Sequence, residues 1–164
     1  MLYDNINIQD VVDSEAAMEF MKEATKLATS TELEDIGIKL EKKANLFSDL
    51  LSEGHISDLT EDEFRQLVGS IFSIKRKANR ILKANGFESL QQSITDLLYG
   101  DDTIDLRFNQ FIDSVDKLDG PMQVNFASEL LHFSNPKKYW LWTNWIWDAK
   151  TGTGSLPLIV HEGV

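Results

Sequence analysis

The sequence predicts a mainly α-helical fold, with about six helices in an orthogonal or bundle-like array and an aromatic β-hairpin at the C-terminus. Up to residue 133, apolar residues recur at three- and four-residue spacing between capping residues, glycines and prolines, as in amphipathic helices. After Asn135-Pro136 this period ends. An aromatic run, a Gly/Thr-rich stretch and a second β-prone run follow, which is typical of a hairpin.

Two helices are expected before Gly54, a residue type that commonly ends a helix. The first runs from Asp13 or Ser14 to Thr29. The second begins at Thr31-Glu32-Leu33-Glu34, which has the form of a capping box, in which a hydroxyl and a carboxylate each satisfy a free backbone N–H. Its apolar face repeats along one side of the helix: Leu33, Ile36, Leu40, Phe47 and Leu51.

A third, longer helix is expected from Thr60 to Gly86, because Thr60-Glu61-Asp62-Glu63 repeats the capping-box pattern. Apolar residues at helical spacing continue through this range. The inward-facing residues are predicted to be Phe64, Leu67, Val68, Ile71, Ala78, Ile81 and Leu82.

Three shorter helices complete the helical part. The fourth opens at Ser89 and stops at Gly100, and the fifth is capped by Asp101 or Asp102. Gly120-Pro121 separates the fifth from a sixth helix over Met122 to Phe133, since proline is well suited to the first turn of a helix.

The chain carries a net charge of −11, placed unevenly. Residues 1–63 contain 16 Asp and Glu against 5 Lys and Arg, while residues 64–164 contain 11 of each kind. An acidic surface of this kind repels nucleic acid and anionic lipid and favours a protein partner with a basic surface. The same charge is also typical of a plainly soluble protein.

The absence of cysteine excludes disulfides, thiolate metal sites and cysteine nucleophiles. No apolar run has the length of a membrane span. The start, Met1-Leu2-Tyr3-Asp4-Asn5, lacks the basic and apolar regions of a signal peptide. A cytoplasmic protein without membrane attachment is therefore expected.

All four tryptophans lie within eight residues, in a stretch that we call the Trp-rich segment, residues 139–148. Three interpretations are open: a hairpin packed on the helices, a protein-interaction surface, or a stacking platform for a base or sugar. In a strand the first two tryptophans share one face and the last two share the other. The candidate partner- or ligand-binding residues are Tyr139, Trp140, Trp142, Trp145 and Trp147.

Glu129 and His132 stand three residues apart, which puts carboxylate and imidazole side by side on one helix. They are the first acid–base candidates, together with Asp148, which is also well placed to begin a turn. Di-iron bundles use a second Glu-x-x-His element, which this chain lacks. Neither a metal nor a cofactor is therefore expected. A structural interpretation is that His132 bonds Glu129 or the carbonyl groups near its helix end.

Basic residues gather on the predicted third helix, where Arg76, Arg80 and Lys83 form one stripe opposite the apolar face. This stripe is either a solvated face paired with the acidic first helices or an anion contact. Lys150 is a further anion candidate, since it stands beside Thr151-Gly152-Thr153-Gly154. That stretch lacks the spacing of a phosphate-binding loop and is expected to form a turn.

From these features we expect one structural domain with two parts. Residues 1–134 form an acidic helical part, and residues 135–164 form a Trp-rich hairpin packed on it. The leading function hypothesis is a non-enzymatic protein-interaction module or small accessory subunit. An alternative is a helical nucleotide-, base- or sugar-binding domain, with or without catalysis, that uses tryptophan stacking and the Glu129–His132 pair.

A DNA-mimicking inhibitor is a third hypothesis. The predicted hairpin is marginal alone, so homo-oligomerisation or a strand-completing partner would cover its open edge. Pro157 predicts that its second strand is an edge strand, because proline cannot donate to a sheet.

Overall fold

The computed structural model describes residues 11–148 and 150–161, which are mainly helical. These residues fall into two compact units. One unit contains the described residues up to Leu40 and from Thr143 onward, and the other is Glu41–Trp142. The sequence predicts a boundary near residue 134 between two parts of one domain. The two compact units are defined by backbone packing and do not test that boundary, which stays a prediction.

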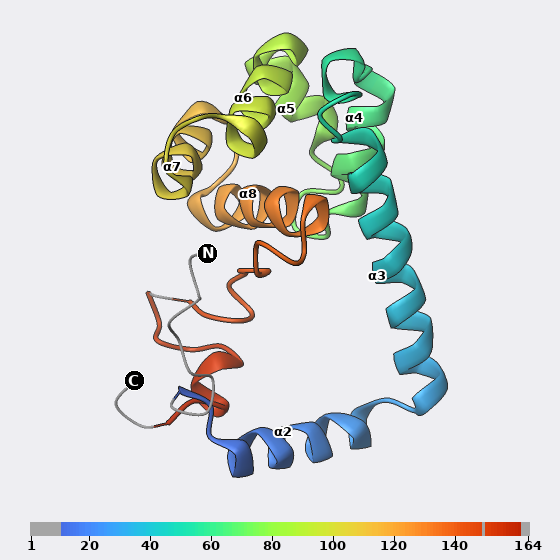
Figure 1. The fold of residues 1–164 in the computed structure, drawn as a ribbon, viewed down its shortest axis with the longest axis vertical. Coiled ribbons are helices and arrows are strands. Elements are labelled where there is room, and N and C mark those ends of the chain that lie inside the picture. The colour runs from blue at the N-terminus through green and yellow to red at the C-terminus, as the bar shows by residue number, and fades with distance from the viewer. Residues whose placement is uncertain (1–10, 149, 162–164) are drawn as a thin grey trace. The chain divides into compact units, whose positions relative to one another are not determined.

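The unit Glu41–Trp142 is built from the second part of α3 and five further helices (Figure 1). α6 packs against α7, and α8 packs against both of them. α5 contacts both α4 and α6. The elements are α3 (Ser30–Leu50), η1 (Ile56–Asp58), α4 (Glu61–Ser70), α5 (Ala78–Asn85), α6 (Phe87–Tyr99), α7 (Ile104–Ser114) and α8 (Gly120–Ser134).

The core of this unit is aromatic and aliphatic. The rings of Phe111 on α7 and Phe126 on α8 meet edge to face, with 5.3 Å between their centroids. Phe47 on α3 lies 5.5 Å from Phe133 at the end of α8. Such ring pairs add stabilisation beyond the area that they bury, so they fix the positions of α3, α7 and α8 within this unit.

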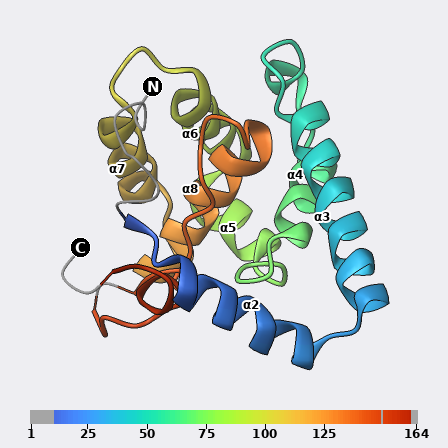
Figure 2. The ribbon, with the colours of Figure 1, turned by 60° about the horizontal axis from the view of Figure 1, so that its bottom comes forward.

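The other unit contains α2 (Ser14–Leu27), the first part of α3 and the short helix η2 (Leu156–Leu158), which lies beside α2 (Figure 2). Asp13 caps α2 by accepting hydrogen bonds from the N–H groups of Glu15 and Ala16. The backbone of residues 159–161 bonds to residues 11–13, including an antiparallel bridge between Val12 and Val160. This pairing holds both ends of the described chain in one unit.

The capping box predicted at Thr31 is wrong, and the box lies two residues earlier. Thr29 N–H donates to Glu32 Oε2 over 2.7 Å, and Glu32 N–H donates to Thr29 Oγ1 over 3.3 Å. Thr29 and Thr31 both stand before acidic residues, so the sequence pattern alone does not decide between them. The box predicted at Thr60 and Glu63 is confirmed, with both reciprocal bonds present.

The long third helix is also wrong, because the chain breaks between α4 and α5. Ser70 Oγ donates to the carbonyl of Leu67, and Ile71 adopts extended backbone angles. Ile71 and Ile74 are nevertheless fully buried, so their apolar spacing comes from turns that face the core. Side chain-to-backbone bonds of this kind compete with helical bonds, which accounts for the stop.

The later helices follow the prediction closely. α6 ends before Gly100, and α8 begins at Gly120 with Asp119 as its cap and Pro121 in the first turn. α6 begins at Phe87 rather than Ser89, and Thr103, not Asp101 or Asp102, occupies the cap position of α7.

The predicted C-terminal hairpin is not supported, since no strand occurs in the described part of the chain. A single antiparallel bridge joins Asp148 to Thr153, so the turn is present without its flanking strands. Pro157, expected on an edge strand, lies in η2. In place of the open strand edge that was expected there, the backbone of residues 159–161 forms hydrogen bonds with residues 11–13 of the same chain.

None of the helices in the described ranges combines the length and the apolar character needed to cross a membrane.

Candidate functional site

The Trp-rich segment begins where α8 ends. The N–H groups of Lys138 and Tyr139 both donate to the carbonyl of Asn135, which forms a tight turn after the helix. The backbone N–H of Trp142 then donates to Ser128 Oγ on α8 over 2.6 Å. These bonds hold residues 135–142 along α8.

Side chains alternate along this part of the segment within the unit Glu41–Trp142. Tyr139 and Leu141 pack against the core. Trp140 is 57% exposed and Trp142 is 39% exposed. The shared face that strand periodicity predicts for the two tryptophans is therefore on the outside of this unit, although the backbone is not a strand.

The rest of the segment lies in the other unit and is pinned by its own turn. The carbonyl of Thr143 accepts from the N–H groups of Ile146 and Trp147, at 2.9 and 3.0 Å. Ser155 N–H donates to the carbonyl of Trp145 over 2.9 Å. Trp145 is 80% exposed, so its indole projects from a backbone that is bonded on both sides.

A hollow of about 510 Å³ opens beside Trp145 in this unit. Leu158, which is 58% exposed, supplies another apolar part of its wall. Its polar lining comes from Asn144, Asp148, Thr153 and Ser155. The combination of an indole face with hydrogen-bonding groups is suited to a flat polar molecule.

Asp148, one of the catalytic candidates, is used by the turn. Its Oδ1 accepts from the N–H of Lys150 over 2.9 Å, and its own N–H donates to the carbonyl of Thr153 over 2.7 Å. Gly152 has a φ of 66°, a left-handed conformation that glycine adopts without strain. Asp148 and residues 150–153 therefore form a turn, as the sequence predicts.

Glu129 and His132 do not bond each other in the described chain; each has a different partner. The Glu129 carboxylate accepts a hydrogen bond from Lys43 Nζ on α3. His132 Nδ1 lies 2.8 Å from the backbone carbonyl of Tyr139, just beyond the helix end. Of the two partners expected for His132, the described chain shows the carbonyl near the helix end rather than Glu129.

Burial raises the pKa of Glu129, and the hydrogen bond and charge of Lys43, with the charge of His132, offset only part of this effect. The Glu129 side chain is 10% exposed. A buried carboxylate paired with one ammonium, which itself lies over the rings of Phe47 and Phe133, is typical of a structural ion pair. Lys43 is the partner that the sequence does not reveal.

The basic candidates do not form one stripe. Arg80 and Lys83 lie exposed on α5, whereas Arg76 lies in the preceding turn, because the helix is broken there. None of the three has an ion-pair partner in the described ranges, so the expected pairing with the acidic helices is not seen. Lys150 is exposed in the other unit.

The sequence did not predict that Arg107 is buried. It is 8% exposed, its Nη1 donates to the carbonyl of Leu97 over 2.8 Å, and its Nε has no partner. Arg107 therefore ties the C-terminal end of α6 to the beginning of α7.

Arg107 also acts on Tyr139. Burial raises the pKa of the Tyr139 phenol, but the hydrogen bonds and charges of Lys138 and Arg107 outweigh burial and leave this pKa lowered.

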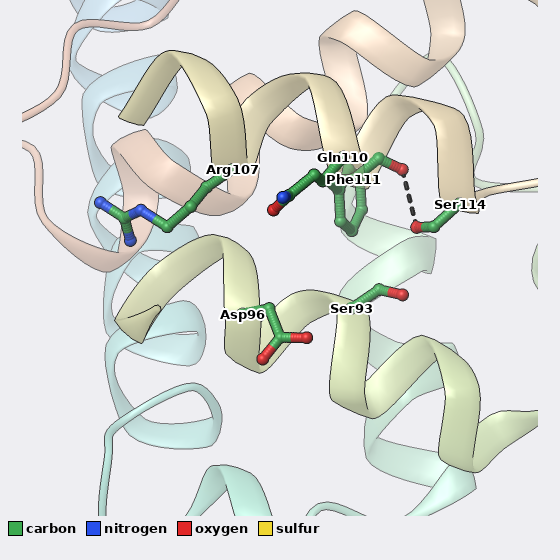
Figure 3. A pocket seen from close by; sticks show the side chains of 6 residues that line it. All are labelled: Ser93, Asp96, Arg107, Gln110, Phe111 and Ser114. Carbon is green, nitrogen blue, oxygen red and sulfur yellow. Dashed lines mark hydrogen bonds between the residues drawn. The ribbon is translucent and has the colours of Figure 1, made fainter. Parts of the chain in front are cut away.

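A second hollow, of about 310 Å³, lies between α6 and α7 (Figure 3). Ser93 and Ser114 stand at one end, and the Arg107 guanidinium extends at the other. The remaining lining residues are Asp96, Gln110 and Phe111. The Arg107 guanidinium therefore lies at the opposite end of the hollow from the two hydroxyls.

Within residues 11–148 and 150–161, no group of three or more His, Asp or Glu side chains is placed to hold a metal ion. Comparison with protein-family models, with curated proteins and with solved structures finds no match to this chain.

Proposed function

We propose that this protein is a non-enzymatic interaction module, or a small accessory subunit, that binds a protein partner through its Trp-rich segment. The observation that supports this most directly is the exposure of Trp145, of which 80% faces solvent. Tryptophan is enriched among the few residues that dominate binding energy at protein interfaces. When a partner covers an exposed indole, a large apolar area is removed from water, and this lowers the free energy of binding.

The backbone around Trp145 supports this proposal further. The bonds from Ser155 to Trp145 and from Leu156 to Ile146, both 2.9 Å, hold the turn before any partner arrives. A side chain presented on a fixed turn loses less conformational freedom on binding, which raises affinity. The net charge of −11 favours a partner with a basic surface and speeds its encounter.

The catalytic candidates favour the same conclusion. Lys43 engages Glu129, the Tyr139 carbonyl engages His132, and Asp148 closes a turn. A general acid or base must be free to reach a substrate proton. Because all three side chains have structural partners, an interaction role explains the arrangement better than catalysis.

The test compares proteins captured by the whole chain with those captured by two single variants. Trp145→Ser removes the exposed indole, and Phe72→Ser removes a matched exposed aromatic, 74% exposed, outside the Trp-rich segment. We expect a defined set of proteins, measured by quantitative mass spectrometry, to be lost from Trp145→Ser and kept by Phe72→Ser. Retention of every captured protein by folded variants at Trp140, Trp142, Trp145 and Trp147 would overturn the proposal.

The hollow beside Trp145 favours a second candidate, a module that stacks a nucleotide, base or sugar on the indole. Asn144 and Asp148 would then accept or donate hydrogen bonds at the rim. A ligand of this class would raise the melting temperature of the chain by mass action, and Trp145→Ser would abolish the rise. A flat melting response to nucleotides and sugars would remove this candidate.

A further inference from the structure

The first part of α3 has a row of exposed apolar side chains. Every residue from 31 to 40 is exposed, including Leu33, Ile36 and Leu40, at 44%, 49% and 49%. These three side chains form one stripe at three- and four-residue spacing. Large apolar side chains that line up on one helical face in this way mark a surface for another protein element rather than scattered exposure.

The sequence of this stretch lowers its helix propensity. Gly37 costs about 1 kcal/mol relative to alanine in a helix interior, and the β-branched Ile36 and Ile38 on either side are weaker helix formers than leucine. Most helical stability in proteins comes from packing of an apolar face. A partner element on the stripe would therefore stabilise this part of α3.

The same helix shows how such a stripe is covered. Farther along, Phe47 on α3 and Leu51, just after its last residue, continue the row and are fully buried. The row Leu33, Gly37, Leu40, Ala44, Phe47 and Leu51 alternates four- and three-residue steps, as in helix–helix seams. At Gly37 a Cβ would meet nothing within 4 Å, so the uncovered half has an open notch for a side chain of an incoming helix.

We propose that residues 31–40 of α3 bind an amphipathic helix of a partner protein whose apolar face is flanked by Lys or Arg. Charge selects this occupant. From residue 13 to residue 40 the chain carries seven carboxylates against three lysines, and Glu32, Glu34 and Asp35 lie in the first turns of α3. A second copy would bring like charges together, which disfavours pairing of two such helices. This surface is independent of the Trp-rich segment.

The probe is a synthetic helix roughly three heptads long, with leucine on one face and lysine beside it, and its counterpart with glutamate in place of lysine. Binding of the labelled peptides to the whole chain is followed by fluorescence anisotropy. We expect the lysine peptide to bind and the glutamate peptide not to bind. Affinity for the lysine peptide is expected to fall as salt rises.

Three variants of the stripe and one matched control locate the site. Leu33→Ser and Leu40→Ser are each expected to weaken binding about tenfold or more, because each removes one buried leucine contact. Gly37→Leu adds apolar surface and helix propensity, yet should weaken binding because it fills the notch. Leu106→Ser on α7, where leucine is 47% exposed, should bind as the unaltered chain does.

Equal binding by Leu33→Ser and the unaltered chain would overturn the proposal, since attraction would then be charge alone. A dimer in sedimentation that Leu33→Ser dissociates would assign the stripe to a second copy instead. A large fall in the melting temperature of the free Leu33→Ser chain would place the stripe against the chain's own surface and also overturn it. Trp145→Ser should leave peptide binding intact, so either proposal can fail alone.

Discussion

Lys43 on α3 and Glu129 on α8 form an ion pair in the core of the unit Glu41–Trp142, with side chains 15% and 10% exposed. Lys43 Nζ also lies 4.5 Å from the centroid of the Phe133 ring and 5.7 Å from that of Phe47. One ammonium thus contacts a carboxylate and two aromatic rings. The pair joins residues that are 86 positions apart and fastens the second part of α3 to α8.

Lys43→Met should destabilise this unit by about 3 kcal/mol, because it leaves the Glu129 carboxylate buried without its cation. Urea unfolding at neutral pH, followed by circular dichroism, measures the loss. Lys26→Met is the matched control, since Lys26 pairs with Glu23 on α2 with both side chains more than half exposed. That change should cost less than about 1 kcal/mol. Equal losses would show that the buried pair has no special role.

The loss in Lys43→Met should shrink as the pH is lowered. Burial already raises the pKa of Glu129, and removal of Lys43 removes the interactions that oppose burial. A carboxyl with a raised folded pKa stabilises the fold most below its unfolded pKa, and this contribution disappears as pH rises through the folded pKa. The melting-temperature gap to the unaltered chain should therefore narrow from about pH 7 to about pH 5.

The double variant Lys43→Met with Glu129→Gln tests the assignment of this pH effect to Glu129. It lacks both titrating partners, so its gap to the unaltered chain should not narrow in the same way. A gap that stays constant in the single variant would contradict the raised pKa of Glu129.

Thr60→Ala should cost about 1 kcal/mol, because Thr60 caps α4 in a reciprocal box with Glu63. The backbone N–H and then the hydroxyl of Thr60 hold the pKa of Glu63 below its ordinary value. Loss of the hydroxyl should therefore raise that pKa, as measured by NMR titration of the Glu63 carboxyl. Thr60→Ser should keep both effects.

Thr31→Ala is the internal comparison, since Thr31 has the same sequence pattern without the capping bonds. It should change the free energy of unfolding by less than about 0.5 kcal/mol. Thr29→Ala, which breaks the box with Glu32, should cost more than Thr31→Ala. The reverse order would show that the box is at Thr31.

The sequence predicts most helices correctly because their ends are marked by local chemistry. Asp13, Thr60 and Asp119 each cap a helix, and Gly100 follows the end of α6. These signals act between residues a few positions apart, so a single sequence contains them. The fold class follows from them.

The errors come from contacts that are not local. Ile71 and Ile74 keep a helical spacing although the chain is turning, because both face a core supplied by other elements. The predicted hairpin does not form because the chain before Asp148 turns back on Thr143 and the chain after Ser155 enters η2, so the bonds between the two sides do not extend into a strand ladder. In the candidate site, the density of the tryptophans identifies the segment but not which indoles are exposed, and the pairing of Glu129 with Lys43 crosses 86 positions and leaves no local signal.

Trp145→Phe should remove the most red-shifted and most readily quenched part of the tryptophan emission, because Trp145 is 80% exposed. Acrylamide quenching of the whole chain and of single Trp→Phe variants measures this. Trp147→Phe is the matched control two positions away, since Trp147 is only partly exposed. A larger loss of quenchable emission in Trp147→Phe would place the exposed indole elsewhere in the turn.

Gly154→Ala should loosen the turn that presents Trp145. Gly154 has a φ of 143°, and a Cβ built there would overlap the carbonyl oxygen of Ile146. The methyl group must push apart the two backbone stretches that Leu156 N–H and the Ile146 carbonyl join over 2.9 Å. NMR should show shifted amide signals over residues 145–156 and little change in α4 to α8.

Gly69→Ala is the matched control for Gly154→Ala. Gly69 is at a helical position in α4 with nothing within 4 Å of the added Cβ, so this change should be stabilising. If Trp145 acts as a preorganised contact, Gly154→Ala should also weaken partner capture while leaving the indole itself in place.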